Sequence, residues 1–209
     1  ATLIPRFWYP KEGVVCIGGV PVTEKTKKDL MNRIAFVFQD TKLLKVSILE
    51  NIRAARPDAT REQVLDALHN AQCDDIIEKF PQGVDTILGT KGIYLSGGEQ
   101  QRLALARAIL KDAPIILLDE ATAFADPENE YKIQLAFEHL TRGKTVLMIA
   151  HRLPTIQNAD EILVLNKGTV VERGTHNALM AQGGIYATMW KDYQTSIAWN
   201  IGKGEYHAS

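Results

Sequence analysis

Two acidic side chains directly follow an apolar run near the middle of the chain, and such a pair can hold a metal ion and activate water. In the run PIILLDE, Asp119 and Glu120 come after four apolar residues. Because open α/β sheets bind ligands at the carboxyl ends of their strands, we expect both carboxylates at such an edge. Asp119 is suited to Mg²⁺, which prefers oxygen ligands, and Glu120 to orienting an attacking water. Taken alone, however, the pattern is better explained by a strand that ends in a solvated acidic turn.

A glycine-containing stretch at 95–110, LSGGEQQRLALARAIL, has residues suited to phosphate binding. Ser96 can cap a helix, Gly97 and Gly98 let the backbone approach a ligand, and free N–H groups at a helix start attract phosphate. The alternative is an ordinary Ser-Gly-Gly turn before an amphipathic helix. The phosphate interpretation is favoured because LSGG, then QQR, then an apolar strand ending in Asp-Glu follow one another in order.

Four short apolar runs alternate with helical patterns and should form the elements that position these groups. The runs lie at 34–39, 114–120, 145–151 and 161–165. Such runs, bounded by polar or turn residues, are typical of strands covered on both faces in a mainly parallel sheet flanked by helices. The last run continues through the Asn-Lys-Gly of 166–168 into TVVERG, which predicts a β-hairpin at the sheet edge.

Between the first two runs, the segment 41–112 is rich in helix formers and contains no convincing strand. Thr60 followed by Gln63 is a capping box that predicts the start of a helix in REQVLDALHNAQ. A second helix is predicted in DDIIEKF, ending before the Pro-Gln-Gly of 81–83. The sequence therefore predicts an α/β fold with a mainly parallel sheet, flanking helices and an inserted helical subdomain.

Composition and charge are those of an ordinary soluble globular protein. Of the 209 residues, 45% are hydrophobic and 23% are charged, and the formal net charge of -1 gives no reason to expect binding to nucleic acid or anionic lipid. Cys16 and Cys73 are not spaced like the cysteine pairs of metal sites or redox motifs. We therefore expect both to be small buried hydrophobic residues and not disulfide partners or metal ligands. No apolar run is long enough to span a bilayer, and no secretory leader is visible. If the protein serves a membrane, we expect it to act from the water side.

The motif LSGGEQQR followed by ILLDEAT resembles the nucleotide-binding domain of an ABC transporter. FQDTKLLKVSILENI and LMIAHRLPTIQNADEILVLNKGTVVERGTH are similar to the exporter-type branch, and the match covers nearly the whole chain in order. The resemblance implies a P-loop ATPase core and an ATP-hydrolysing motor for transport across a membrane. It also implies four parts: the first part of the core at 1–40, the helical subdomain ending in the signature motif at 41–112, the rest of the core at 113–190, and a C-terminal tail at 191–209.

The resemblance implies roles for four residues at the ends of the predicted strands. Asp119 would hold Mg²⁺, and Glu120 would be the base that polarises the attacking water. Gln39 matches the Q-loop glutamine, which approaches Mg²⁺ and the water and reports to the membrane domain. His151 matches the switch histidine, which contacts the γ-phosphate of ATP. Without the resemblance, Gln39 and His151 would be more simply explained as a surface amide and a structural histidine.

The resemblance also implies a site shared between two domains. The segment from Ser96 through Gly97 and Gly98 matches the signature loop, which contacts the γ-phosphate of the nucleotide held by the opposite domain. Glu99 stands where Gln is usual, and this variant should still build the loop. Asp126 matches the D-loop aspartate, although a simple helix cap would also explain it. The expected partner is a second nucleotide-binding domain, in a homodimer or a heterodimer, and a monomer should be nearly inert.

The opening ATLIPRFWYPKEG resembles the stretch that lies in and just after the helix that starts at the Walker A phosphate loop of this family. The motif Gly-x-x-x-x-Gly-Lys-Ser/Thr occurs nowhere in the chain, so we expect a domain truncated at its N-terminus. Losing a lysine and several backbone donors would remove roughly 8 kcal/mol of binding energy, because charge-assisted hydrogen bonds contribute about 1.5–3 kcal/mol each. We therefore expect the chain alone to bind ATP weakly.

A leucine-rich segment after Gln39 is expected to face a membrane domain. The resemblance places 41–51 under a short coupling helix of the transmembrane domain. The apolar socket there would be formed by Leu43, Leu44, Val46, Ile48 and Leu49. The alternative is that these side chains pack inside the helical subdomain. The resemblance also implies a location on the cytoplasmic face of the plasma (inner) membrane.

Two functions from other classes remain as alternatives. A soluble ABC ATPase of DNA repair or translation should show tandem cassettes, a long coiled-coil insertion or a basic face, and the sequence has none of these. A non-catalytic ATPase-derived interaction module is disfavoured by Glu120 and His151 and favoured by the missing phosphate loop. The cargo of a transporter is chosen by its transmembrane helices. However, ATAFADPENE and WKDYQTSIAW are similar to half-transporters linked to iron chelates and peptide-like products.

Overall fold

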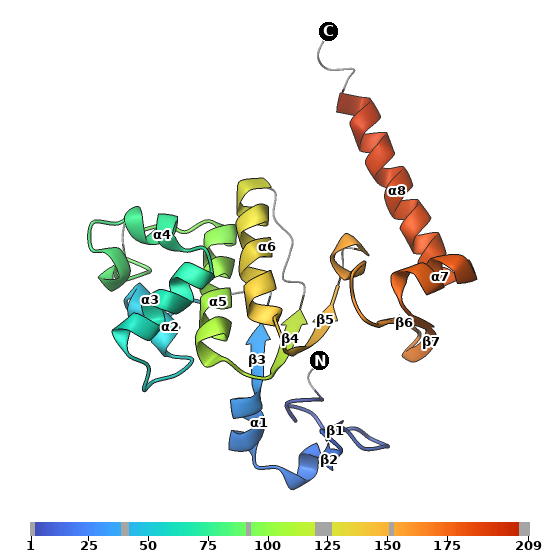
Figure 1. The fold of residues 1–209 in the computed structure, drawn as a ribbon, viewed down its shortest axis with the longest axis horizontal. Helices are drawn as coiled ribbons and strands as arrows, with labels where there is room; N and C mark the ends of the chain where they lie inside the picture. Colours follow the sequence, from blue (N-terminus) through green and yellow to red (C-terminus); the bar gives the residue numbers. More distant parts are fainter. Residues whose placement is uncertain (1–2, 39–41, 91–92, 120–126, 151–152, 205–209) are drawn as a thin grey trace. The chain divides into compact units, whose positions relative to one another are not determined.

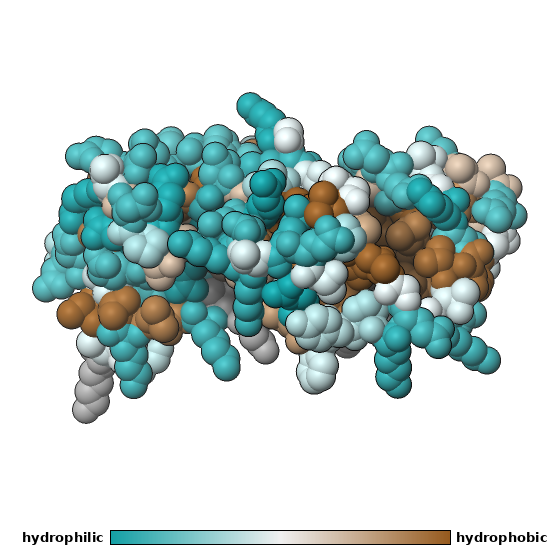
Figure 2. All heavy atoms as spheres, turned by 90° about the horizontal axis from the view of Figure 1, so that it is seen from below, coloured by the Kyte–Doolittle hydropathy of each residue, from teal (hydrophilic) through white to brown (hydrophobic). Residues whose placement is uncertain are grey.

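The computed structural model describes residues 3–38, 42–90, 93–119, 127–150 and 153–204. The chain divides into two compact units, Ala1–Ile149 and Ala150–Ser209, and each is described by itself (Figure 1). Figure 2 shows a largely hydrophilic face in which apolar side chains form brown patches. No described helix is both long enough and apolar enough to cross a bilayer.

The first unit is built on a three-stranded parallel sheet in the order β3-β4-β5. Its strands are β3 (Ile34–Val37), β4 (Ile115–Asp119) and β5 (Thr145–Ile149). Ile34 pairs with Ile115, which pairs in turn with Thr145, so the three strands begin level with one another. The connection from β4 to β5 contains α6 (Pro127–Thr141), as a parallel crossover requires. The three strands predicted from the first three apolar runs are therefore confirmed, but the expectation that each is covered on both faces is wrong for β5, which is largely exposed.

A group of helices lies between β3 and β4 in the chain. It comprises α2 (Ile48–Arg53), α3 (Arg61–Asn70), α4 (Asp74–Glu78), the 3-10 turn η2 (Gly83–Asp85) and α5 (Gly97–Lys111). The predicted capping box begins α3, since the Gln63 N–H donates to Thr60 Oγ1 at 3.3 Å and the Thr60 N–H donates to Gln63 Oε1 at 3.0 Å. The helix α4 ends before Phe80 and is shorter than the predicted DDIIEKF helix. Both predicted helices are thus present, with α4 ending sooner than predicted, and the exact domain boundaries stay a prediction.

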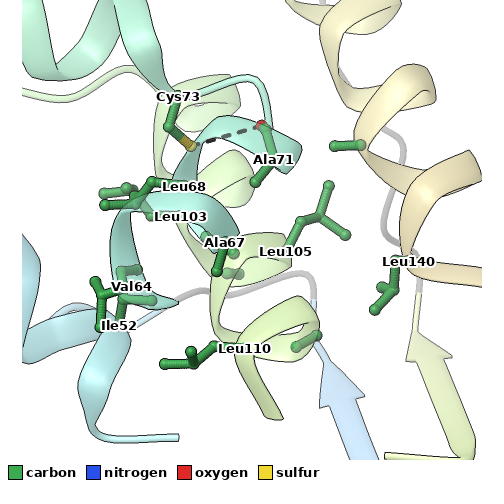
Figure 3. Close-up of a cluster of buried hydrophobic side chains, with 14 of the residues drawn as sticks. Ile52, Val64, Ala67, Leu68, Ala71, Cys73, Leu103, Leu105, Leu110 and Leu140 are labelled. Atoms are coloured by element: carbon green, nitrogen blue, oxygen red, sulfur yellow. Dashed lines mark hydrogen bonds between the residues drawn. The ribbon is translucent and has the colours of Figure 1, made fainter. Parts of the chain in front are cut away.

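One apolar core joins these helices to the sheet, and Figure 3 shows its central part. Its fully buried side chains include Ile52, Val64, Leu68, Leu103, Leu105 and Ile116. The helix α5 supplies side chains to this core along most of its length. Because burying one leucine side chain contributes about 1.5–3 kcal/mol, packing of this kind is the main force that holds α5 in place.

The two cysteines differ in exposure. Cys73 is fully buried in the apolar core, where burial raises the pKa of its thiol. Cys16 is exposed. It belongs to a short hairpin, since the elements before β3 are β1 (Cys16–Ile17), β2 (Val20–Pro21), the 3-10 turn η1 (Val22–Glu24) and α1 (Lys27–Arg33). The expectation of a buried cysteine is confirmed for Cys73 and wrong for Cys16, because a two-residue strand has no face covered by the core.

The fourth apolar run lies in the second unit. It forms β6 (Ile162–Asn166), which pairs antiparallel with β7 (Thr169–Gly174). At the turn, Lys167 and Gly168 have φ of 48° and 80°, as a two-residue hairpin turn requires. The hairpin prediction is confirmed. Within the described ranges, however, β6 pairs with β7 and not with the parallel sheet, so a single sheet containing all four runs is not observed.

The rest of the second unit is helical. Its elements are the 3-10 turn η3 (Leu153–Ile156), α7 (His176–Gln182) and α8 (Ile185–Gly204). A small separate core packs the hairpin against these helices through Ile162, Val164, Leu179, Tyr186 and Trp190. Most of the segment expected to be a C-terminal tail is therefore helix.

Candidate functional site

The carboxyl ends of the three parallel strands form one edge of the sheet, where the sequence predicts the reacting groups. Leu118 pairs with Val37 on one side and with Met148 on the other, and Asp119 pairs with Ile149. Asp119 is the last residue of β4 and is partly exposed. One predicted site residue is therefore placed at the predicted edge.

Four other predicted residues, Gln39, Glu120, Asp126 and His151, lie outside the described residues. The strands β3, β4 and β5 end shortly before Gln39, Glu120 and His151 in the sequence. The described strands that precede Gln39, Glu120 and His151 in the sequence have their carboxyl ends at the same edge of the sheet.

A metal ion at this edge would have Asp119 as its described protein ligand. Among the described residues, no three His, Cys, Asp or Glu side chains are grouped closely enough to hold a metal ion. A single carboxylate at a strand end suits Mg²⁺, because this ion usually keeps several waters and takes its other ligands from substrate phosphates. Asp119 therefore fits a magnesium ion that is bound together with a nucleotide.

The signature segment begins α5 with a complete capping box. The Ser96 hydroxyl accepts a hydrogen bond from the Glu99 N–H at 3.2 Å, and the Glu99 carboxylate accepts one from the Ser96 N–H at 2.6 Å. The second Glu99 oxygen accepts from the Lys79 ammonium at 3.2 Å. A glutamate at position 99 therefore builds the turn, and the positive end of the α5 dipole is directed toward the signature segment.

Gly98 lies where the first turn of α5 touches the first turn of α6. A Cβ atom added at Gly98 would come within 2.9 Å of Asn129 Cβ, which is closer than real Cβ atoms approach. A side chain at this position would therefore force the two helices apart. The sequence suggested that this glycine allows close approach of a ligand, and the structure adds a second reason, the close approach of α6.

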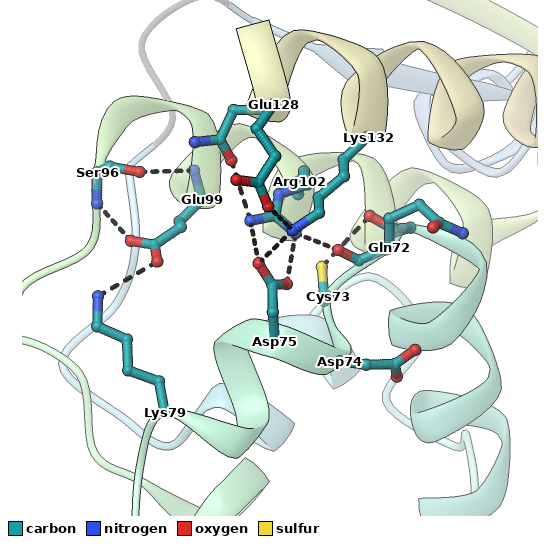
Figure 4. A network of polar contacts seen from close by, with 12 residues as sticks. Gln72, Cys73, Asp74, Asp75, Lys79, Ser96, Glu99, Arg102, Glu128 and Lys132 are labelled. Carbon is teal, nitrogen blue, oxygen red and sulfur yellow. Dashed lines mark hydrogen bonds and ion pairs between the residues drawn. The ribbon is translucent and has the colours of Figure 1, made fainter. Parts of the chain in front are cut away.

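A buried arginine joins α5 to α4 and α6 just beyond the signature segment (Figure 4). Arg102, whose side chain is 1% exposed, donates to the two carboxylate oxygens of Asp75 at 2.6 and 3.0 Å. It also donates to Asn129 Oδ1 at 3.0 Å and to the backbone carbonyl of Gln72. Lys132 of α6 donates to the same Asp75 carboxylate at 3.0 Å. Asp75 is therefore shared by cations from two helices.

The charges of this network keep each other ionised. Burial by itself would raise the pKa of Asp75, but hydrogen bonds from Arg102 and Lys132 outweigh it and lower that pKa to about 2. The pKa of Lys132 is raised by its hydrogen bonds to Glu128, at 2.8 Å, and to Asp75. The network could not be predicted from the sequence, because nothing in the motifs DDII and QQR indicates that Asp75 and Arg102, which are 27 residues apart, are in contact.

The predicted membrane-facing socket is only partly at the surface. Leu44 and Val46 are 53% and 38% exposed. Leu43 packs against the apolar core, and Ile48 and Leu49 are buried in it. For Ile48 and Leu49 the socket prediction is therefore wrong and the alternative, packing inside the helical subdomain, is correct. Ser47 caps α2, so Ile48 and Leu49 are the first two residues of this helix. Both lie on its side that packs against the apolar core.

A parallel sheet, an acidic residue at a strand end and a capped signature helix are the features expected of a nucleotide-binding ATPase domain. The family model described as "ABC transporter" matches residues 1–123, more than half of the chain. The chain belongs to the ABC transporter family. The predicted fold class and the resemblance to exporter-type members are confirmed by the relatives and the solved structure described next.

Among curated relatives, the chain is 50% identical over 196 residues to the mycobactin import ATP-binding/permease protein IrtA of Mycobacterium tuberculosis, covering 94% of the chain and 23% of that protein. It is 48% identical over 188 residues to an ATP-dependent lipid A-core flippase of Chromohalobacter salexigens, covering 90% of the chain and 32% of that protein. The chain thus spans about a quarter to a third of the length of these relatives. A solved bacterial Atm1-family ABC exporter with ATP bound is similar at a TM-score of 0.84 and 40% identity, over 92% of this chain and 34% of that one.

Proposed function

We propose that this chain is the ATP-hydrolysing motor domain of an exporter-type ABC transporter, in which hydrolysis powers the movement of cargo across a membrane. The observation that carries the proposal is the 40% identity over 92% of the chain to an ABC exporter with ATP bound. A non-transport ABC ATPase is less well supported, because the relatives described above are named for import or flipping. An interaction module is less well supported because the residues proposed for catalysis are present.

For the acidic edge we propose that Asp119 binds Mg²⁺ and that Glu120 accepts a proton from the attacking water. Gln39 would approach the same ion and water and report to the membrane domain, and His151 would contact the γ-phosphate of ATP. The shared edge at which β3, β4 and β5 end supports this assignment. When bound, Mg²⁺ would supply positive charge that stabilises the negative charge of the reacting phosphate.

The other half of each site is proposed to come from a second nucleotide-binding domain. Ser96, Gly97, Gly98 and Glu99 of that domain would face the γ-phosphate, with Asp126 beside them. The capped start of α5 supports this assignment, because the first backbone N–H groups of a helix and its dipole attract phosphate. A single domain would hold only half of each site, and the monomer should therefore hydrolyse ATP slowly. The second domain would be another copy of this chain, in a homodimer, or a related domain, in a heterodimer.

The proposed membrane partner is a transmembrane domain that contacts this chain through a coupling helix, at the cytoplasmic face of the plasma (inner) membrane. The relatives named ATP-binding/permease proteins support such a partner. For the cargo we propose an iron chelate, in view of the 50% identity to a mycobactin importer. The flippases are nearly as similar, and a peptide-like product was the other expectation, so lipid and peptide cargo are the alternatives to compare.

Residues 1–209 contain no phosphate-loop motif. We propose that these residues alone bind ATP weakly and are inactive, since the lysine and backbone donors of that motif would have to come from elsewhere. Isothermal calorimetry on residues 1–209 checks this, and micromolar ATP affinity would contradict it.

The decisive experiment for the function is Glu120→Gln in the complete transporter. If Glu120 is the base, phosphate release should fall by at least about 100-fold, while ATP should still bind because glutamine keeps the shape of the side chain. Steady-state phosphate release and binding of a fluorescent ATP analogue measure the two effects. The matched control is Glu138→Gln on the exposed side of α6, which should hydrolyse ATP like the wild type. An undiminished rate in Glu120→Gln would show that the proposed mechanism is wrong.

A further inference from the structure

Three turns beyond the signature segment, Arg107 of α5 binds neutral oxygens of a different part of the chain. Its Nε donates to the backbone carbonyl of Asn51 at 2.8 Å, and its Nη2 donates to Asn51 Oδ1 at 2.6 Å. Its Nη1 donates to the backbone carbonyl of Lys42 at 3.0 Å. Arg107 is partly buried, and this burial lowers the pKa of its guanidinium. Because guanidinium donors point in fixed directions, three such bonds define one relative position of α5, Asn51 and Lys42.

Asn51 of α2 is fully buried and fastens the 42–47 segment. Its Oδ1 accepts from the Leu44 N–H at 2.8 Å. Its Nδ2 donates to the carbonyls of Leu44 at 3.0 Å, Val46 at 3.2 Å and Ser47 at 3.0 Å. The same carbonyl of Val46 accepts from the Leu88 N–H at 3.0 Å. The 42–47 segment is therefore held by a side chain whose position is in turn fixed by α5.

The 42–47 segment also carries the two side chains of the predicted socket that are exposed, Leu44 and Val46. One continuous set of hydrogen bonds thus runs from α5, through Arg107 and Asn51, to these two residues. Ser96 and Arg107 lie about 16 Å apart along the helix axis, since each residue of an α-helix rises 1.5 Å. A displacement at one end of α5 is therefore carried to the other end by a rigid helix.

We propose that Arg107 is a positioning residue that makes the 42–47 segment follow the movement of α5. The inference rests on the proposed function, in which α5 begins at the nucleotide and the 42–47 segment faces the membrane domain. Arg107 would then act through Asn51 and would touch neither nucleotide nor cargo. Without it, the apolar core still holds α5, but the 42–47 segment can change position independently of the helix.

The test uses the complete transporter in phospholipid nanodiscs and measures amide hydrogen exchange of 42–47 with and without ATP plus vanadate. Arg107→Gln removes the charge and the three-donor geometry. Asn51→Asp keeps the side-chain shape and still accepts from Arg107, but it cannot donate to the three carbonyls of the 42–47 segment. The second variant decides the question if the first does not fold.

The matched control is Arg61→Gln. Arg61 of α3 donates to the two oxygens of Asp85 at 2.9 and 2.6 Å on the surface of the same subdomain. The change therefore removes a guanidinium of the same subdomain whose hydrogen bonds go to Asp85 and not to the 42–47 segment. Exchange of this segment should remain like that of the wild type in the control.

In Arg107→Gln and Asn51→Asp, the Leu44 amide should exchange at least about tenfold faster. The change that ATP plus vanadate causes in the exchange of 42–47 should disappear, while the KM for ATP stays within about twofold of the wild type. A merely structural role would instead accelerate exchange throughout α2 and α5, and this outcome would overturn the proposal. So would a retained response of 42–47, or no response in the wild type. Failure of the proposed function is distinguishable, because the wild type would then not hydrolyse ATP at all.

Discussion

In α5 the charged side chain of Arg102 is 1% exposed, whereas in β5 the apolar side chains of Leu147 and Ile149 are each 38% exposed. The helix α5 contacts α2, α3, α6 and β3, so its charged residue is surrounded by other elements. Among the described strands, β5 pairs with β4 alone. Burial is therefore decided by the number of neighbouring elements at a position, and a polar residue that is enclosed must find partners for its hydrogen-bonding groups.

The largest loss of stability is expected for Arg102→Ala. Removing this enclosed side chain leaves a cavity and takes the donor away from the carbonyl of Gln72, so we expect the free energy of unfolding to fall by about 3–5 kcal/mol. Urea denaturation followed by circular dichroism measures the change. The surface control Arg61→Ala should lower the free energy of unfolding far less, because exposed ion pairs contribute little. Equal losses in both variants would remove the distinction between the enclosed and the exposed arginine.

A second pair of variants compares β5 with β4 directly. Leu118 of β4 is 1% exposed, and Leu147 of β5 is 38% exposed. We expect Leu118→Ala to lower the free energy of unfolding by about 2–5 kcal/mol, because it leaves a cavity in the core. Leu147→Ala removes a side chain that is already partly in contact with water, and it should cost no more than about 1 kcal/mol. Thermal unfolding of the two variants side by side checks the order, and a larger loss for Leu147→Ala would contradict it.

The smallest expected effect is the pH dependence of stability that comes from Asp75, which binds Arg102 of α5 and Lys132 of α6. The pKa of Asp75 in the folded state is about 2, below its ordinary value of 3.8. A lowered pKa stabilises the folded state above the ordinary value, and this contribution is lost as the pH falls from about 4 to about 2. Since the Asp75 side chain is 42% exposed, solvent screening reduces the contribution to about 1 kcal/mol or less.

The Asp75→Asn variant separates this contribution from the titration of other carboxylates. Its free energy of unfolding should be lower than that of the wild type at pH 6, and the difference should shrink between about pH 4 and pH 2. Urea titrations at a series of pH values give the comparison. A difference that stays constant down to pH 2 would mean that Asp75 is not the group that titrates.

Local features of the fold were accessible from the sequence, because they depend on neighbouring residues. The capping boxes at Thr60 and Ser96 and the Asn-Lys-Gly turn of the hairpin each involve side chains and backbone within a few positions. The three parallel strands followed from apolar runs of suitable length, and the family followed from motifs in a fixed order. For the site, Asp119 was correctly expected at a strand end.

Other features depend on contacts that sequence spacing does not encode. The Asp75–Arg102 pair and the Arg107–Asn51 contact join residues that are 27 and 56 positions apart. The exposure of Cys16 and of β5 depends on which elements cover them, and an apolar pattern gives no information about this. For the same reason the five socket side chains could not be divided into buried and exposed members until α2 was placed.

The unequal environments of the two cysteines make the chain convenient for fluorescence work. Both thiols are free, but Cys16 is exposed, whereas Cys73 is fully buried and its raised pKa disfavours the reactive thiolate. A maleimide dye should therefore attach to Cys16 in the native protein without any cysteine being removed. Two differently labelled copies would then report their association by energy transfer.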